Sequence, residues 1–384
     1  RYLETISVIL FTELSIKFID MVNSKILIGI MSGTSLDGID IAITRIDKRK
    51  ISVLDFLHIN YSAELKEKIL KLHFPEKNEL EKSSMLSNDL AVLTGRGINR
   101  LLITNNLSAK QIKGVGYHGQ TIRHRPDKGF STQIGNADLL SEITNLTVVS
   151  NFRNRDIAAK GQGAPLVPAF HKDIFYSKTK NRVILNIGGI SNITYLPSVG
   201  SVIGFDCGPG NILMDHWIKV NHGLNFDKNG KWAKKGQIID DLLKYFLSDN
   251  FFKKKPPKST GRDLFNLDWI KKSIKKSYSP EDIQRTLLEL TAISIAKAIK
   301  KHCSKANEIY VCGGGAKNIF LIEILKNKTN LSIQTTGDLN LPEQQVEAVA
   351  FAWLANQTLN KKFNNSPDVT GAKGFRILGS IHQS

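Results

Sequence analysis

Two segments of this 384-residue chain share one plan, in which an apolar strand, a glycine-containing turn and a second apolar strand follow one another. The first segment, residues 25–46, reads KILIGIMSGTSLDGIDIAITRI, and the second starts at Arg182 with RVILNIGGISNITYL. Apolar, β-branched runs joined by short turns predict pairs of adjacent strands. The likeness is one of form rather than of letters, and it predicts two similar lobes, each built on a sheet.

The rest of the chain alternates between helical and extended patterns, which predicts a layered α/β architecture. No Pro- or Ser-rich linker interrupts it, so we expect an N-terminal lobe over residues 25–181 and a C-terminal lobe over 182–384 that share a cleft. The last helix, expected at 341–359, should pack back towards that cleft. Residues 1–24 are expected to be an upstream extension, because the chain starts with Arg and Met21 precedes the first convincing strand. Helices are also expected at 64–72, 87–103, 137–144 and 279–302, and strands at 112–117, 147–152, 202–205 and 308–312.

Composition and charge exclude several classes of protein. Hydrophobic residues make up 41% of the chain and charged residues 23%, which is typical of a folded globular protein and not of a disordered or collagen-like one. The net charge, 53 − 35 = +18, can indicate a nucleic-acid partner. The lysines are dispersed, however, and no aromatic residues are interleaved with the densest run, residues 253–258. We therefore expect a solvated basic surface and no nucleic-acid partner.

Cysteine usage and hydropathy favour the cytoplasm. The three cysteines, Cys207, Cys303 and Cys312, are too few and too scattered for a disulfide framework or a zinc motif. No segment reaches the roughly 20 apolar residues of a membrane-spanning helix. The opening segment also lacks a small-residue cleavage site, so we expect no signal peptide and no membrane partner.

Three glycine-rich turns follow apolar strands, at residues 33–38, 188–192 and 313–315. Glycine lets backbone amides approach an anion closely, and the hydroxyls of Thr34, Ser35 and Ser191 add donors. None of the turns matches the P-loop or the dinucleotide fingerprint. One such turn alone is most often structural, but three at strand ends in a two-lobed chain favour a bound nucleotide.

Acidic residues lie within these turns. Asp37 and Asp40 stand in the first, and Asp206 follows the apolar run VIGF. Mg²⁺ that is bound to nucleotide phosphates needs only one or two protein carboxylates, so Asp37 and Asp206 are candidate ligands, directly or through water. The alternative for each is an Asp that caps a turn.

At this point the letters resemble a known family. The segments MSGTSLDGIDIAI, GYHGQTIRHRP, TQIGNADLLSE, NFRNRDIAAKGQGAPLVPAFH, NIGGISNIT, FDCGPGN and VCGGGAKN occur in the order expected of the anhydro-N-acetylmuramic acid kinase family. The resemblance extends from about residue 25 to the last helix. It implies the two-lobed, actin-like (ribonuclease H-like) ATPase fold of the sugar kinase, Hsp70 and actin superfamily, with a nucleotide between the lobes.

The resemblance also implies a chemistry. A homodimeric enzyme would use ATP and Mg²⁺ to hydrolyse the 1,6-anhydro ring of 1,6-anhydro-N-acetylmuramic acid and to phosphorylate O6. The products would be N-acetylmuramic acid 6-phosphate and ADP, in peptidoglycan recycling. Two alternatives stay open: a kinase of the same fold that acts on an ordinary hexose or amino sugar, and a non-catalytic ATP-gated sensor or nucleic-acid-binding protein. The presence of Asp37, Asp156 and Asp206 together argues against the non-catalytic alternative.

Site residues follow from the matched motifs. Asp156 would be the general base, although the sequence alone would leave it an ordinary loop acid. The motifs imply three nucleotide segments: Gly33, Thr34, Ser35, Leu36, Asp37, Gly38, Ile39 and Asp40; Gly188, Gly189, Ser191 and Asn192; and Gly313, Gly314 and Gly315 near the adenosine. The sugar would contact His118, Gln120, Asn136, Asp138 and Glu347. For His118 and Glu347 the alternative is a satisfied, partly buried polar group.

Two further features bear on this site. Arg123, His124, Arg125 and Arg153 form a basic set near the motifs, suited to a sugar carboxylate or a triphosphate. Lys160 stands where the family usually has a second glycine. If that position needs a positive φ, Lys160 should strain the backbone; if its side chain is exposed, the change should be harmless.

Overall fold

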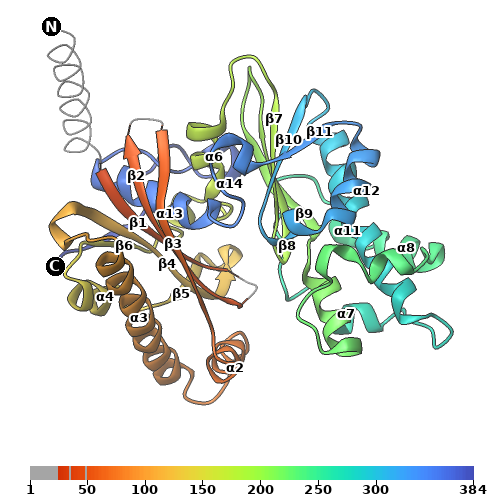
Figure 1. Cartoon of the computed structure of the whole chain (residues 1–384), viewed down its shortest axis with the longest axis horizontal. Helices are drawn as coiled ribbons and strands as arrows, with labels where there is room; N and C mark the ends of the chain where they lie inside the picture. The colour runs from red at the N-terminus through yellow and green to blue at the C-terminus, as the bar shows by residue number, and fades with distance from the viewer. Residues whose placement is uncertain (1–24, 34–35, 48–49) are drawn as a thin grey trace, which may run out of the picture.

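The computed structural model describes residues 25–33, 36–47 and 50–384, so the expected upstream extension lies outside the described residues. Within them, helices surround two separate β-sheets that lie side by side (Figure 1). This arrangement confirms the α/β class and the presence of one sheet in each half.

The first sheet has the strand order β12-β6-β4-β1-β2-β3, and β5 pairs with β4. β1 and β2 pair antiparallel, which confirms the predicted hairpin, and β1 runs parallel to β4. Helices α2 (Ala63–Lys71), α3 (Glu79–Thr104) and α4 (Ala137–Thr144) contribute to the core on one face of this sheet. Its strands are β1 (Lys25–Ser32), β2 (Gly38–Asp47), β3 (Lys50–Asn60), β4 (Ile112–Arg125), β5 (Phe130–Ile134), β6 (Val148–Ser150) and β12 (Ser380–His382).

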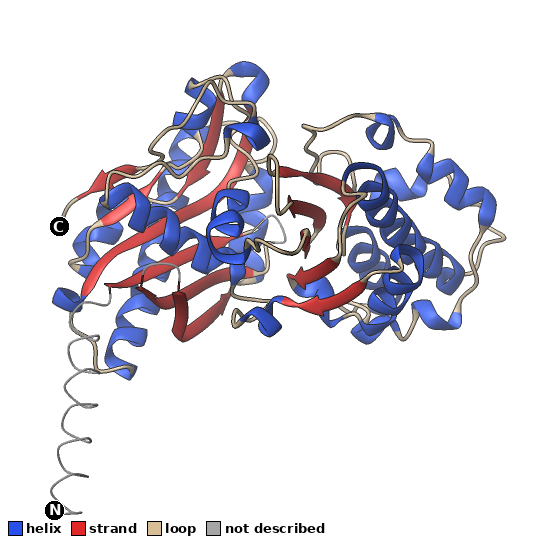
Figure 2. Cartoon of the chain, turned by 90° about the horizontal axis from the view of Figure 1, so that it is seen from above, coloured by secondary structure: helices blue, strands red, loops and turns tan. Residues whose placement is uncertain are grey.

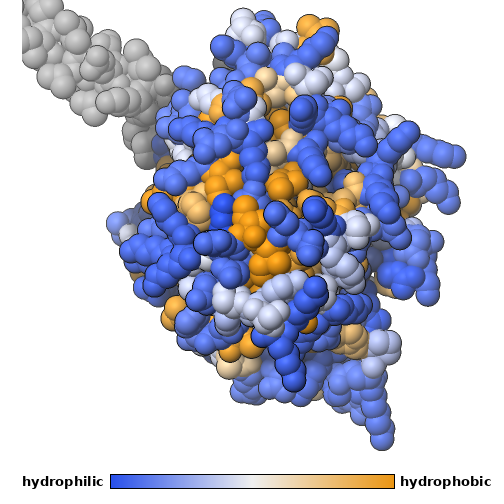
Figure 3. All heavy atoms as spheres, turned by 90° about the vertical axis from the view of Figure 1, so that its right-hand side faces the viewer, coloured by the Kyte–Doolittle hydropathy of each residue, from blue (hydrophilic) through white to orange (hydrophobic). Residues whose placement is uncertain are grey.

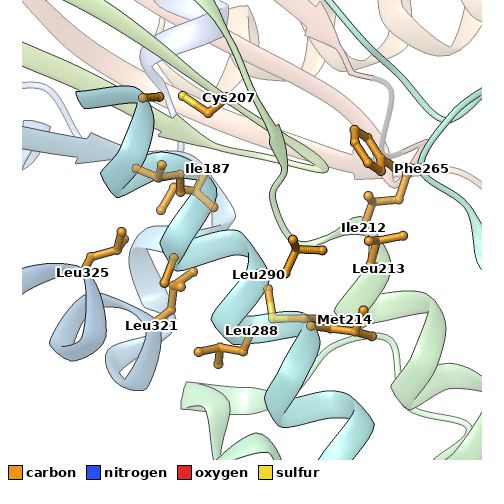
Figure 4. Close-up of a cluster of buried hydrophobic side chains, with 14 of the residues drawn as sticks. Ile187, Cys207, Ile212, Leu213, Met214, Phe265, Leu288, Leu290, Leu321 and Leu325 are labelled. Carbon is orange, nitrogen blue, oxygen red and sulfur yellow. The ribbon is translucent and has the colours of Figure 1, made fainter. Parts of the chain in front are cut away.

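The second sheet has the order β11-β10-β7-β8-β9, with bounds β7 (Arg182–Ile187), β8 (Ile190–Leu196), β9 (Ile203–Pro209), β10 (Glu308–Cys312) and β11 (Ser332–Thr335). Side chains of α7 (Ile212–His222), α11 (Pro280–His302) and α12 (Ile319–Thr329) form a core with it (Figure 4). α11 starts as predicted, since the side chain of Ser279 accepts a hydrogen bond of 3.2 Å from the amide of Asp282.

Helix α13 (Val346–Leu359) packs on the first sheet, against β1 and β4. A Cβ on Gly29 would collide with the backbone oxygen of Ala348, and one on Gly116 with that of Phe351. These two glycines therefore let the helix backbone rest directly on the strands. The helix begins later than the expected residue 341, because the chain forms a turn at residues 343–345.

The end of the chain also joins the first sheet, where β12 pairs antiparallel with β6. Figure 2 shows this C-terminal end beside the sheet of the first half. The proposed division between residues 181 and 182 stays a prediction, with the addition that α13 and β12 pack with the N-terminal strands. The short helices are α5 (Asn154–Ala158), α6 (Val167–Phe175), α8 (Asp240–Leu247), α9 (Asn250–Lys253), α10 (Leu267–Lys271) and α14 (Pro367–Thr370).

The surface and the cysteines fit the composition. Figure 3 shows a mainly hydrophilic face around a smaller apolar area. All three cysteines are buried, free thiols. Among the described residues, no helix is long and apolar enough to cross a lipid bilayer.

Candidate active site

The first glycine-rich turn links β1 to β2, and its residues Thr34 and Ser35 lie outside the described part of the chain. Leu36 and Ile39 are buried in the core of the first sheet, so only their backbone groups could serve a nucleotide. Asp37 is exposed, and its Oδ1 accepts a 3.1 Å hydrogen bond from the amide of Gly38. Asp40 pairs with Nδ1 of His58 at 2.7 Å.

Glycines of the second and third turns border open space. A Cβ on Gly188, Gly189 or Gly314 would meet no atom closer than 3.6 Å, and none of the three has a positive φ. Neither packing nor backbone conformation requires glycine there, which leaves close approach of a ligand as a physical reason for it. The backbone around Gly188 and Gly189 is fixed by the amides of Asn211 and Gly210, each at 2.8 Å, just before α7 begins.

Other residues of these turns are held by the fold. Gly313 has φ +81°, and a Cβ on Gly315 would collide with Ile187. The hydroxyl of Ser191 is buried and donates to the carbonyl oxygen of Gly208 at 3.1 Å, so it is not directed at a ligand as expected. Asn192 is partly exposed and lies opposite Asp206 across the β8–β9 pair.

Two partly buried carboxylates come from the two halves of the fold, one on a strand of the second sheet and one on the helix that packs on the first sheet. Burial raises the pKa of Asp206, on β9, to about 7, although the Thr260 amide donates to its Oδ2 at 2.9 Å and Lys258 and Arg153 favour its ionised form. Burial also raises the pKa of Glu347, in the first turn of α13, to about 7, where Asp40 adds repulsion and Arg153 opposes the shift. Carboxyl groups that titrate near neutral pH suit proton transfer.

Arg153 connects this pair to His118. Its Nη2 donates to Nε2 of His118 at 2.9 Å, and its Nη1 donates to the carbonyl oxygen of Gly163 at 2.8 Å. Burial and the charge of Arg153 lower the pKa of His118 to about 3, so the imidazole is neutral near pH 7. Arg153 is thus the member of the basic set that belongs to the carboxylate pair, since Arg123 pairs with Glu79 and Arg125 with Asp127.

The position of Asp156 does not support its predicted role as base. It lies in the short helix α5 rather than in a loop, and its side chain is 0% exposed. Its Oδ2 accepts from the amide of Gly163 at 2.8 Å, and its Oδ1 accepts from Thr370 at 2.9 Å and from Asn365 at 3.3 Å. These contacts tie α5 to the C-terminal segment and leave no exposed oxygen for a substrate.

Three other residues expected to contact the sugar are held in structural contacts. Gln120 is buried and donates to the carbonyl oxygen of Gly33 at 3.3 Å. Asn136 caps α4 by accepting from the amide of Leu139 at 3.0 Å. Asp138 is exposed on α4 and pairs with Nδ1 of His382 at 2.6 Å. Among the five expected sugar residues, only His118 and Glu347 share the neighbourhood of Arg153.

A pocket of about 240 Å³ lies beside His118, between β4, β5, β6 and α5. We call it the β4–β6 pocket. It carries no charged residue: its lining residues are Tyr117, His118, Gly119, Ser131, Thr132, Gln133, Gly135, Ser150, Asn151 and Asn154.

Sequence reasoning missed Asp215 and Arg262. Burial raises the pKa of Asp215, in the first turn of α7, to about 7, and Arg262 opposes that shift. Asp37 and Asp215 in turn favour the charged form of Arg262, so these three charges link the turn before β2 in the first half with α7 in the second. The sequence did offer a signal for Asp215, because a carboxylate stands in the first turn of the helix that follows FDCGPGN. Within the described ranges, no three His, Cys, Asp or Glu side chains are grouped to hold a metal ion by themselves.

Comparison with known proteins gives a consistent result. The family described as anhydro-N-acetylmuramic acid kinase matches residues 25–384. The enzyme of that name from Nitrosospira multiformis is 46% identical over 358 residues, covering 92% of this chain and 98% of the relative. Those from Pseudomonas fluorescens and Acinetobacter baylyi are 45% and 46% identical, covering 92% and 93% of this chain and 98% and 99% of each relative.

Among solved structures, the activator of the 2-hydroxyisocaproyl-CoA dehydratase from Clostridium difficile with bound ADPNP is similar with a TM-score of 0.44 and 13% identity. The match covers 88% of this chain and 96% of the activator. This likeness is too remote to carry an inference about function.

Proposed function

The chain belongs to the anhydro-N-acetylmuramic acid kinase family, and from that premise we propose that the carboxylates around Arg153 perform the family's two coupled steps. The sugar's anhydro ring is opened by water, and its O6 receives the γ-phosphoryl group of ATP. The observation that carries the assignment of residues is the pair Asp206 and Glu347, one on β9 and one on α13. Both are influenced by Arg153, and both have a pKa near 7.

Asp206, rather than Asp156, is the proposed general base. Water attacks the anomeric carbon, the bond from that carbon to O6 breaks, and Asp206 takes the proton that the water loses. O6 attacks the γ-phosphorus and ADP leaves. A base with a pKa near 7 is ionised in part at neutral pH and still basic enough to accept a proton. The Thr260 amide holds one carboxylate oxygen and thereby fixes the direction of the other.

The nucleotide phosphates are proposed to lie against the open glycines Gly188, Gly189 and Gly314, with the turn at residues 33–40 opposite them. Backbone amides in such turns, together with the start of α7, supply donors and a positive dipole for phosphate. Mg²⁺, when bound, neutralises phosphate charge during transfer. With Asp206 acting as base, the exposed Asp37 is the carboxylate that would hold this ion, through a water molecule that the ion retains.

The sugar is proposed to contact His118, Glu347 and Arg153. Arg153 and its positive charge suit the lactyl carboxylate of the muramic acid, and the neutral His118 suits an uncharged hydroxyl or amide group. We further propose that the protein is cytoplasmic and homodimeric. The three buried free thiols are compatible with a reducing compartment. No observation favours the hexose kinase or the sensor.

An ADP-release assay with 1,6-anhydro-N-acetylmuramic acid in ¹⁸O-labelled water tests the proposal. We expect label at C1 of the product and little ADP with glucose or N-acetylglucosamine. Asp206→Asn should keep ATP binding and lose at least about 100-fold in turnover. Asp156→Asn is the comparison, since its contacts are structural: it should lower the melting temperature more than the turnover of the folded enzyme. Full turnover by Asp206→Asn would overturn the assignment of the base.

A further inference from the structure

Outside the proposed kinase site, Ser150, His382 and Asp138 form a continuous chain of hydrogen bonds. Ser150 Oγ lies 2.9 Å from Nε2 of His382, and Nδ1 of His382 lies 2.6 Å from Oδ1 of Asp138. The three residues come from β6, β12 and α4, more than 230 positions apart at the extremes. The pairing of β12 with β6, in which Ser380 lies opposite Ser150, brings the histidine to the serine.

The hydrogen bonds define the histidine's protonation pattern. A carboxylate accepts only, so Nδ1 of His382 carries a proton and donates it to Asp138. In the neutral ring, Nε2 is then an acceptor that faces the hydroxyl of Ser150. This order of carboxylate, imidazole and hydroxyl is the one that activates a serine nucleophile, and it is recognised by geometry rather than by sequence position.

Ser150 also borders a space that can hold a substrate, because it lines the β4–β6 pocket. The pocket volume of about 240 Å³ is enough for a small acyl group and part of its alcohol. Its walls present hydroxyl and amide groups, the neutral imidazole of His118 and no charged side chain, so the pocket adjoins the proposed sugar site through His118. Such a lining favours a neutral, hydrogen-bonding molecule over an anion or a cation.

The residue after Ser150 carries a side-chain amide at the pocket. Asn151 has φ +55° and also lines the pocket. Its Oδ1 accepts from Nδ2 of Asn154 at 2.8 Å, which orients the amide. In the described part of the chain, Nδ2 of Asn151 donates no hydrogen bond, so it stays available to a ligand. A side-chain amide next to the nucleophile can stabilise a tetrahedral intermediate.

From these contacts we propose that Ser150, His382 and Asp138 form a second catalytic site, which hydrolyses small neutral acyl esters such as acetyl esters of sugars or polyols. Ser150 Oγ attacks the ester carbonyl and passes its proton to Nε2 of His382, which gives it to the departing alcohol. Water then attacks the acyl-serine, and its proton passes through His382 to Ser150. The products are the alcohol and the carboxylic acid, and water is the co-reactant.

Two measurements on the full chain test this site. The first is hydrolysis of 4-nitrophenyl acetate, which should fall at least about 10-fold in Ser150→Ala and in His382→Gln. Asp138→Asn should have a smaller effect, because the Asp138 side chain is 82% exposed and water can replace it. The second is covalent labelling by a fluorophosphonate, followed by mass spectrometry of the peptide that contains Ser150.

Ser380→Ala is the matched control, since Ser380 faces Ser150 across the strand pair, is exposed and makes no hydrogen bond to His382. It should leave both hydrolysis and labelling unchanged. Melting temperature is measured for every variant, so that unfolding is not mistaken for loss of the nucleophile. Absence of label on Ser150, or equal hydrolysis by Ser150→Ala and the unaltered chain, would overturn the proposal and show that the three side chains only fasten the C-terminus.

Discussion

Arg153 donates a hydrogen bond of 2.9 Å to His118, and the same guanidinium favours the ionised forms of Asp206 and Glu347. One buried cation therefore affects the protonation of three groups. It adds to the effect of burial in keeping His118 neutral, and it limits how far burial raises the pKa of either carboxyl group. Any pH dependence of activity near neutrality should come from the carboxyl groups of Asp206, Glu347 and Asp215, whose pKa values are raised to about 7. His118 should not contribute to it, because its pKa is about 3.

The pH profile of the kinase reaction should depend on Arg153. If Asp206 must be ionised to act as base, kcat/KM should rise with pH through about 7. Arg153→Gln removes a charge that stabilises the carboxylate, so the midpoint should move upward by about half a unit or more, together with a loss of rate. Arg125→Gln is the matched control, because Arg125 is exposed and pairs with Asp127. A midpoint that moves downward would contradict this assignment.

The buried carboxylate of Asp206 should lower the free energy of unfolding at alkaline pH, where it is ionised. Its folded-state pKa is raised from 3.8 to about 7, so the folded state binds more protons between these pH values, and stability falls as pH rises through the folded pKa. Asp206→Asn removes that cost. We expect its melting temperature to exceed that of the unaltered chain by about 2 °C or more at pH 8.

At pH 5 the unaltered chain already carries a protonated Asp206, and the difference in melting temperature should shrink. Scanning calorimetry at both pH values measures this. An equal difference at the two pH values would indicate that the gain has another origin.

Local patterns in the sequence were sufficient to predict much of the fold. The β1–β2 hairpin and the start of α11 at Ser279 depend on neighbouring residues, and both are present. The predicted strand at 112–117 instead continues to Arg125, because β5 pairs with residues 120–125. That pairing, like the edge strand β3, depends on partners that a local pattern does not identify.

The sequence predicts those parts of the candidate site that depend on the local backbone conformation of a turn. It does not predict the side-chain contacts between residues that are far apart in the chain. The open glycines Gly188 and Gly314 are in turns that the sequence marks clearly. Asp156 resembles a site residue in its own segment, yet its partners Asn365 and Thr370 are more than 200 positions away. The same holds for Arg153, whose contact with His118 requires the assembled sheet.

Gly188→Ala and Gly314→Ala should each weaken ATP binding without lowering the stability of the fold. Neither glycine has a positive φ, and a Cβ there would meet only one atom, at 3.6 Å. We therefore expect melting temperatures within about 1 °C of the unaltered chain and a Kd for ATP at least several-fold higher, because the methyl group occupies space proposed for phosphate or adenosine. Isothermal titration calorimetry measures this. Unchanged ATP affinity in both variants would contradict the proposed nucleotide position.

Gly116→Ala, in contrast, should lower the stability of the fold. Its Cβ would collide with the backbone oxygen of Phe351, so α13 must move away from β4. We expect a loss of about 2–3 kcal/mol in unfolding free energy, as for overpacking of a core. Because α13 also carries Glu347, the folded fraction should have reduced turnover. Urea unfolding and the ADP assay together test this, and a variant of full stability would show that the helix does not rest on this strand.

Lys160 gives the most direct test of backbone strain. Its φ is +69°, a conformation that costs an L-residue about 1–2 kcal/mol, and its side chain is exposed. Lys160→Gly removes that cost. The greater conformational freedom of glycine stabilises the unfolded chain, which offsets about 0.5–1 kcal/mol of the gain. We expect a net gain of about 0.5–1 kcal/mol in the free energy of unfolding, measured in urea, with unchanged turnover. Lys160→Ala separates backbone from charge, since alanine keeps the strain and should show no gain; equal stabilisation by both substitutions would assign the effect to the lost lysine charge instead.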